Sequence, residues 1–287
     1  MCKPANSELV KCRKALNPLW ILLILFMVTG GEKLLGNASQ PKQTIAGLAS
    51  PATRNITWNA GSRSLEFSNG VKMEFVWIPA GSFTMGSQYN TEKPPHTVII
   101  TKGFYLDKYE VTQAQWQSVM GNNPSCFRGD QRPVDMVSWD DSQVFIRKLS
   151  QLTGKKFRLP TEAEWEYACR AGTETKYYWG DQADGNCMWY DDAGGMTTQD
   201  VGGKQPNAWG LYDMCGNLWE WCNDWYGGNF YLNSPAEDPQ GPTSGTWRVL
   251  RGGSWHSEDY MCRSANRIPH NPVGRSHGVG IRLVYSP

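Results

Sequence analysis

Residues 207–225 form the stretch that most constrains how this chain of 287 residues can fold. The stretch reads Asn-Ala-Trp-Gly-Leu-Tyr-Asp-Met-Cys-Gly-Asn-Leu-Trp-Glu-Trp-Cys-Asn-Asp-Trp, with four tryptophans among nineteen positions. Buried aromatic rings remove a large apolar area from water and can hold irregular backbone in place. The asparagine, aspartate and glycine between the rings favour turns and left-handed backbone. The stretch therefore predicts a rigid loop core, of a kind that can wrap around an ion.

The composition points to a fold held by aromatic packing and turns rather than by long helices. The chain has 14 tryptophans and 30 glycines, and its formal net charge is +1. The near-neutral balance lacks the basic surface that nucleic-acid binding requires. The length suffices for one large domain with additional segments, or for two small domains.

The N-terminus has the pattern of a targeting segment. Lys3, Lys11, Arg13 and Lys14 precede an apolar run over residues 19–28. This order is typical of a secretory signal peptide, and the run is short for a membrane span of about 20 residues. We expect a signal peptide over residues 1–38 with cleavage after Ala38; the alternative is an uncleaved N-terminal anchor. Either reading predicts an extracytoplasmic protein (secreted, periplasmic or lumenal) that meets a membrane only through this segment.

Residues 39–70 are polar without a clear period and are interpreted as a linker, so the folded domain is expected to cover residues 71–287. Within it, β-branched and aromatic content predicts strands over 73–78, 83–85, 96–101, 104–111, 247–251 and 279–285. Capping residues predict helices over 138–154 and 161–172, and a shorter helix is expected over 112–120. Residues 172–245 show turns and aromatics only. The pattern predicts an α+β domain rich in loops, and a loop region of this length is expected to serve a function or hold a ligand.

Six cysteines lie outside the targeting segment, and none of them forms a Cys-x-x-Cys pair. Their spacing therefore gives no zinc-ribbon or thioredoxin-like motif. An extracytoplasmic compartment permits disulfides, so one to three structural bridges are expected, with connectivity that the sequence does not give.

An ordered set of motifs resembles the formylglycine-generating enzyme family, also called sulfatase-modifying factors. The set spans about residues 71–287. Its members are Phe75-Val-Trp-Ile-Pro-Ala-Gly-Ser-Phe-Thr-Met-Gly, Glu110-Val-Thr-Gln, Arg132-Pro-Val-Asp-Met-Val-Ser-Trp, Arg158-Leu-Pro-Thr-Glu-Ala-Glu-Trp-Glu-Tyr-Ala, Gly210-Leu-Tyr-Asp-Met, Gly216-Asn-Leu-Trp-Glu-Trp, Arg251-Gly-Gly-Ser-Trp and Gly280-Ile-Arg.

The resemblance implies an α+β, C-type-lectin-like fold with little regular secondary structure and with bound calcium. Calcium takes six to eight oxygen ligands, which irregular loops supply through their carbonyls. Residues matching one family site are Cys215, Gly216 and Leu218 through their carbonyls and Glu220 through its carboxylate. Residues matching a second site are Asn186 and Cys187, with Asp191 or Asp192 as acidic ligand. The alternative for Glu220 is a hydrogen-bonded structural carboxylate.

The resemblance also implies a reaction. Enzymes of the family use oxygen to oxidise a cysteine of a sulfatase polypeptide to formylglycine, with copper held by two cysteines after a Gly-Gly-Ser stretch. Two thiolates suit Cu(I). This chain keeps Gly252-Gly253-Ser254, and the serine matches one beside the oxygen site, but Cys262 is the single cysteine that follows. The candidate catalytic residues are therefore Ser254 and Cys262, and the missing partner argues against the ordinary copper chemistry.

Cys262 has three interpretations: a disulfide with Cys222, a reactive thiol, or an inert buried thiol. The four histidines show no His-x-x-x-His or His-Glu-x-x-His spacing, and an isolated histidine is more often a surface or hydrogen-bonding residue than a ligand. His256 and Glu258 would be the first residues to consider if the family's chemistry had diverged to another metal.

Three functions remain open at this level. The first is an extracytoplasmic oxidoreductase of the formylglycine-generating type, acting on a protein cysteine or related side chain. The second is a calcium-bound scaffold without catalysis that binds a protein or glycan in the cell envelope. The third is an oxidase with a different metal or substrate.

Overall fold

The computed structural model describes residues 56–287, except residues 90 and 194. Residues 54–287 form one compact unit. The expected signal peptide or anchor over 1–38 and the first part of the expected linker lie outside the described residues. No helix in the described part of the chain is long and apolar enough to cross a membrane.

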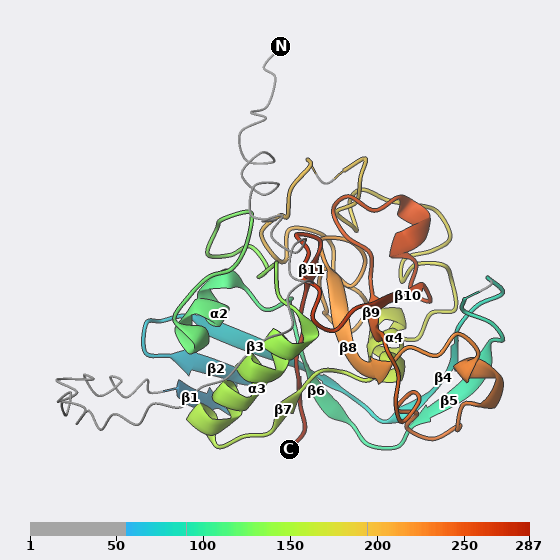
Figure 1. The fold of residues 1–287 in the computed structure, drawn as a ribbon, viewed down its shortest axis with the longest axis horizontal. Coiled ribbons are helices and arrows are strands. Elements are labelled where there is room, and N and C mark those ends of the chain that lie inside the picture. The colour runs from blue at the N-terminus through green and yellow to red at the C-terminus, as the bar shows by residue number, and fades with distance from the viewer. Residues whose placement is uncertain (1–55, 90, 194) are drawn as a thin grey trace, which may run out of the picture. The chain divides into compact units, whose positions relative to one another are not determined.

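A six-stranded sheet with the order β1-β2-β3-β6-β12-β7 forms one side of the unit (Figure 1). All its pairings are antiparallel. Its strands are β1 (Ile56–Asn59), β2 (Ser64–Phe67), β3 (Lys72–Ile78), β6 (Phe104–Asp107), β7 (Phe157–Arg158) and β12 (Val284–Tyr285).

The hairpin β1–β2 corrects the expected domain boundary, because the linker interpretation is wrong for residues 56–70. Leu65 and Phe67 are buried in the same core cluster as Met73 and Phe75 of β3. Strands of four residues give only two inward positions each, so their alternation is too short to stand out from a polar segment.

A second sheet has the order β10-β9-β8-β11, and β4 pairs with β5 in a separate ribbon. The pairing of β11 with β8 is parallel. The strands are β4 (Gly81–Met85), β5 (His96–Ile100), β8 (Trp219–Trp225), β9 (Arg248–Arg251), β10 (Arg267–His270) and β11 (Val279–Gly280). The expected strand over 279–285 is thus two short strands, because the chain passes from one sheet to the other between them.

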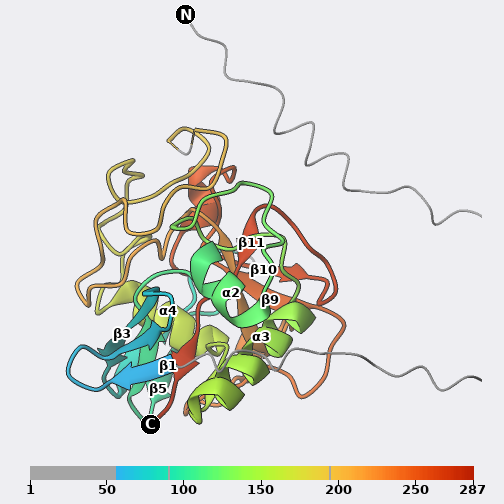
Figure 2. The same ribbon diagram turned by 90° about the vertical axis from the view of Figure 1, so that its left-hand side faces the viewer.

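Three helices begin and end at residues that cap them. Helices α2 (Gln113–Met120), α3 (Trp139–Thr153) and α4 (Glu162–Arg170) each start with a capping box, at Thr112, Ser138 and Thr161. Such boxes satisfy two amide donors of the first turn reciprocally. Helices α2 and α3 pack against each other, and α3 also contacts β1 and β7 (Figures 1 and 2). The predicted helices are confirmed; α4 ends at Ala171 in left-handed backbone, one residue before the expected Gly172.

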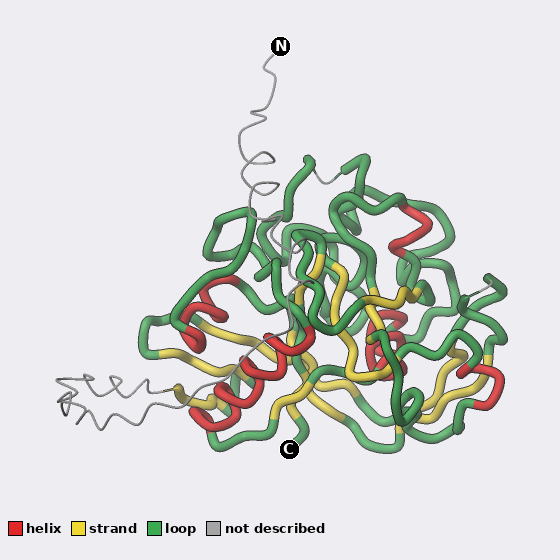
Figure 3. The backbone as a smooth tube through the Cα atoms, viewed as in Figure 1, coloured by secondary structure: helices red, strands yellow, loops and turns green. Residues whose placement is uncertain are grey.

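The region between α4 and β8 contains no helix or named strand among its described residues, as expected, and loops dominate that part of the tube in Figure 3. The tryptophan-rich run is different. Its second half is the seven-residue strand β8, buried over most of its length, whereas a loop core was expected. A strand buried on both faces lacks polar alternation, so its sequence does not show the period of a strand.

Candidate functional site

The turn after β9 places the Gly-Gly-Ser stretch. Gly252 and Gly253 have φ values of 99° and 79°, in the left-handed region that favours glycine. A Cβ on Gly253 would lie 2.4 Å from Cys262 Sγ, so the second glycine lets the turn contact the segment that follows. The turn is closed by a hydrogen bond from the Ser257 amide to the Ser254 carbonyl, 2.9 Å long. The structure therefore brings Ser254 and Cys262 close together, as candidates from one motif.

Ser254 connects this turn to an imidazole. Its Oγ lies 3.2 Å from His256 Nδ1 and 2.9 Å from Ser257 Oγ. Ser254 is fully buried, whereas His256 is exposed. The three side chains form a short polar chain from the interior to the surface.

A second imidazole lies beside the first. The ring centroids of His256 and His277 are 5.2 Å apart, and both rings pack on Trp255, at 4.5 and 5.5 Å. Trp255 is buried, contacts Phe127 edge-on, and donates from Nε1 to the His277 carbonyl. Sequence reasoning missed His277, which lies twenty-one residues after His256 and joins it only through the tertiary fold.

Both imidazoles favour the neutral form. Burial and the neighbouring His277 lower the pKa of His256, while Asp191 acts in the opposite direction. Burial lowers the pKa of His277. Because the ordinary histidine pKa is already near 6.5, both rings are neutral at neutral pH and each has a nitrogen lone pair.

Cys262 is sealed in the interior. Its side chain is 0% exposed, and its thiol contacts the Glu258 carbonyl at 3.9 Å. Burial raises the pKa of Cys262 to about 12. A nucleophilic or metal-binding cysteine acts as a thiolate, and this environment disfavours the thiolate. Of the three interpretations, the inert buried thiol agrees with the structure.

The expected disulfide between Cys222 and Cys262 is wrong. Both residues are free thiols, buried at different places of the core. Cys222 lies on β8, where its carbonyl accepts from Trp139 Nε1, and Cys262 lies at the end of the 3-10 helix Asp259–Cys262. Sequence proximity to one sheet gave no information on which way each thiol points. The free cysteines among the described residues are Cys169, Cys187, Cys215, Cys222 and Cys262.

Glu220 forms a buried ion pair. Its carboxylate accepts from Arg282 Nη2 at 2.8 Å and from Trp165 Nε1 at 2.7 Å, and the side chains of Glu220 and Arg282 are both 0% exposed. Arg282 Nε lies 3.0 Å from each carboxylate oxygen. The carboxylate of Glu220 is thus engaged by protein donors, which agrees with the alternative of a structural carboxylate.

Three more buried acids surround Arg282, and sequence reasoning missed them. Burial raises the pKa of Asp213 to about 6 and raises the pKa values of Glu110 and Asp107 well above their ordinary range. Glu110 accepts from the Leu218 amide and from Asn217 Nδ2. Asp213 Oδ1 is buried without a hydrogen-bond partner. Asp213 stands in the Gly-Leu-Tyr-Asp-Met motif, which is the sequence signal that could have identified it.

The calcium sites expected from the resemblance fit the structure unequally. In the described part of the chain, no three His, Cys, Asp or Glu side chains form a metal-binding group. At the loop of Cys215, Gly216 and Leu218, the unpaired Asp213 oxygen and the excess of carboxylates over Arg282 suit a cation. Glu220, which was expected to bind the ion, is paired instead.

The second expected site has less to offer. Asn186 directs its amide to Asp184 Oδ1, and its carbonyl accepts from the Gln205 amide. The Cys187 carbonyl accepts from Tyr178 OH at 3.0 Å. Asp191, one of the two acids suggested for this site, donates its amide to Ser257 and so belongs to the Ser254 turn.

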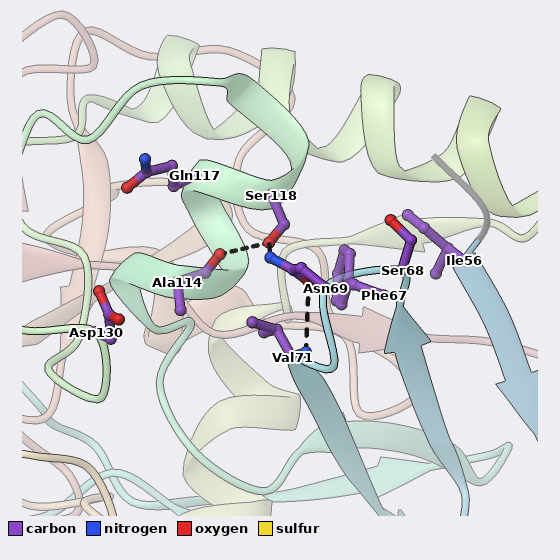
Figure 4. Close-up of a pocket in the computed structure, with 9 residues that line it drawn as sticks. All are labelled: Ile56, Phe67, Ser68, Asn69, Val71, Ala114, Gln117, Ser118 and Asp130. Atoms are coloured by element: carbon purple, nitrogen blue, oxygen red, sulfur yellow. Dashed lines mark hydrogen bonds between the residues drawn. The ribbon is translucent and has the colours of Figure 1, made fainter. Parts of the chain in front are cut away.

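A cavity of about 500 Å³ lies elsewhere, between the β1–β2 hairpin and α2 (Figure 4). Asn69 Nδ2 donates to Ser118 Oγ across it, and Ser118 in turn donates to the Ala114 carbonyl. Asp130 is its one charged lining residue. None of the residues expected from the sequence lines it, and we assign it no role.

Comparison with known proteins places this geometry in a family. Residues 65–287 match the model of the sulfatase-modifying factor enzyme 1-like domain. The chain is 37% identical over 281 residues to the formylglycine-generating enzyme of Streptomyces coelicolor, covering 72% of this chain and 87% of that protein. The mouse (Mus musculus) formylglycine-generating enzyme is 27% identical over 372 residues, 98% of this chain and 97% of its own length.

Solved structures agree in fold. Treponema denticola variable protein 1 superposes with a TM-score of 0.71 at 34% identity, covering 76% of this chain and 96% of that one. PvdO from Pseudomonas aeruginosa gives a TM-score of 0.69 at 25% identity, covering 79% and 98%. The fold class is α+β with the C-type-lectin-like arrangement expected from the sequence. The chain belongs to the formylglycine-generating enzyme, or sulfatase-modifying factor, family.

Proposed function

We propose that this protein is an extracytoplasmic oxidoreductase that uses oxygen to oxidise a side chain of a polypeptide, by a route that does not need a copper-bound cysteine pair. The observation that carries the proposal is the Ser254–His256–His277 cluster on the retained Gly-Gly-Ser turn. It gives the expected position of the family's chemistry two neutral imidazoles at the surface.

Copper bound as in the family does not fit these residues. Cys262 is alone on its segment, fully buried and held in the thiol form by its high pKa. A two-coordinate Cu(I) site needs two thiolates. No step of the proposed reaction is therefore assigned to such a centre.

His256 is suited to move a proton. In the tautomer whose Nδ1–H donates to Ser254 Oγ, the Nε2 lone pair is free to accept a proton from a substrate thiol or hydroxyl. Ser254 Oγ then donates to Ser257 Oγ, which fixes the ring. General-base catalysis of this kind is worth about 10²–10⁴-fold in rate.

A peptide assay tests this function. A Cys-x-Pro-x-Arg peptide is incubated with the untagged protein and oxygen, with and without added copper, and analysed by mass spectrometry. We expect the mass loss of cysteine-to-formylglycine conversion without a copper requirement, retained in Cys262→Ala and in the control His96→Gln, and lost in His256→Gln. Product that requires copper and Cys262, or an unchanged peptide under all conditions, overturns the proposal.

A second function, a scaffold without catalysis that binds a protein or glycan, is favoured by the sealing of every free cysteine in the described part of the chain. Calcium is proposed for both functions, at the loop of Asp213, Cys215, Gly216 and Leu218. The extracytoplasmic location rests on the N-terminal sequence. Sequencing the first residues of the mature protein tests it: retention of Met1 would contradict cleavage after Ala38 and leave the anchor.

A further inference from the structure

We infer that His256 and His277 together form a binding site for one divalent first-row transition ion, of the class of Zn²⁺, Ni²⁺ or Cu²⁺. The inference deepens the proposed function, because it names the ion that would act at the same surface. Binding is nevertheless measured without any activity.

The spacing of the two rings suits one shared ion. A metal lies about 2.0–2.1 Å from an imidazole nitrogen, so it lies about 3.2 Å from the ring centroid, and a tetrahedral angle separates two such centroids by about 5 Å. The observed separation of His256 and His277 is 5.2 Å, with 36° between the ring planes. Both rings can therefore reach one ion with little rearrangement.

The platform beneath the rings is rigid. Trp255 is 5% exposed, and its ring contacts both imidazoles. Its Nε1 donates to the His277 carbonyl at 3.2 Å, which ties the two chain segments together. A ligand pair held in this way loses little conformational freedom when an ion binds.

The polar contact of His256 has the form that metal-bound histidines show. Such histidines usually donate their second ring N–H to a neighbouring oxygen, which fixes the tautomer. Ser254 Oγ is placed for that bond at Nδ1 and is itself held by Ser257 Oγ. This leaves Nε2 of His256 as the coordinating atom.

Access and charge agree with the assignment. His256 is exposed and His277 half-buried, so an ion can enter from solvent. Asp191 is exposed, its charge stabilises protonated His256, and its amide donates to the Ser257 carbonyl. Its carboxylate attracts a cation to the rings, and water completes the coordination.

Calorimetric titration of the untagged, folded protein with ZnCl₂, and electron paramagnetic resonance with CuCl₂, test the site. We expect one ion per chain and nitrogen hyperfine structure for copper. His256→Gln and His277→Gln should each weaken binding more than about tenfold, and Ser254→Ala, through loss of the ring's orientation, about tenfold. His96→Gln is the matched control, because its ring lies on β5 against Tyr231.

Absence of binding by the intact protein, or binding that survives in the folded double variant His256→Gln/His277→Gln, overturns the site. Circular dichroism establishes that each variant is folded. Zinc or copper binding without peptide oxidation would leave the metal site standing and overturn the proposed function. Peptide oxidation with no ion bound would do the reverse.

Discussion

Arg282 shows at the scale of single residues how this protein tolerates buried charge. It pairs with Glu220, donates to the carbonyls of Asp107 and Tyr212, and lies entirely out of water. A buried charge is costly unless its partners satisfy it. Removing one partner leaves the other charge uncompensated, so the identity of each partner matters more than the number of pairs.

Glu220→Gln is expected to lower the free energy of unfolding by about 3–5 kcal/mol, because it leaves the Arg282 charge buried without its counterion. Glu74→Gln is the matched control. It breaks the exposed Glu74–Lys108 pair, 3.1 Å long, which should cost less than about 1 kcal/mol. Urea denaturation measures both, and equal losses would contradict the structural role of Glu220.

Asp224 makes stability depend on pH. Burial and the neighbouring Glu162 raise its pKa from 3.8 to about 8, and its carboxylate accepts the Glu162 amide at the start of α4. A carboxyl whose pKa is raised on folding binds its proton more tightly in the folded state. Stability from this group is therefore greatest at low pH and falls as the pH rises from about 4 to about 8.

Asp224→Asn removes this ionisation while keeping an oxygen for the Glu162 amide. Relative to the wild type, the variant should gain stability as the pH rises, reaching on the order of a few kcal/mol above pH about 8. Denaturation midpoints across that range provide the measurement. A constant difference between the two proteins at every pH would refute the raised pKa.

The buried thiols give a third prediction at this scale. In the native protein, Cys222 and Cys262 should resist iodoacetamide, and both should be alkylated after unfolding without a reductant, because they are free and buried. Peptide mass spectrometry reads the result. A peptide pair linked through Cys222 and Cys262 would restore the disulfide interpretation.

Among the elements, the turn between β9 and the 3-10 helix is the most constrained. Gly253→Ala combines a left-handed backbone with a Cβ that would lie 2.4 Å from Cys262 Sγ and 2.9 Å from its Cα. We expect a loss of at least about 2 kcal/mol, with reduced thermal stability. Gly228→Ala is the control, because no atom lies within 4 Å of its added Cβ, and its effect should stay below about 0.5 kcal/mol.

How well elements could be predicted followed from where their signals lie. The helices were found because their caps are local: Thr112, Ser138 and Thr161 each pair with the residue three positions on. The strand β8 was missed because its partners, β9 and β11, lie far along the chain. Its tryptophans are equally consistent with a packed loop until those partners are known.

At the scale of the whole molecule, calcium is expected to act through the acidic cluster around Arg282. An ion bound to the folded state alone raises stability by mass action. Calcium should therefore raise the melting temperature of the wild type, and chelation with EGTA should reverse the rise. The gain should disappear in Asp213→Asn, which lacks the unpaired anionic oxygen, whereas Asp181→Asn, an exposed aspartate, should keep it. An equal gain in both variants would place the ion elsewhere.

The sequence by itself determined the family, the α+β class, the capped helices and the absence of a cysteine pair after Gly253, because these depend on residue identity and short-range spacing. The tertiary structure alone decided which charges and rings meet. It paired Glu220 with Arg282, kept Cys222 apart from Cys262, and brought His277 to His256. In the tryptophan-rich run it also turned half of an expected loop into the central strand β8. Contacts between residues tens of positions apart arise when the two sheets pack, and no local pattern encodes them.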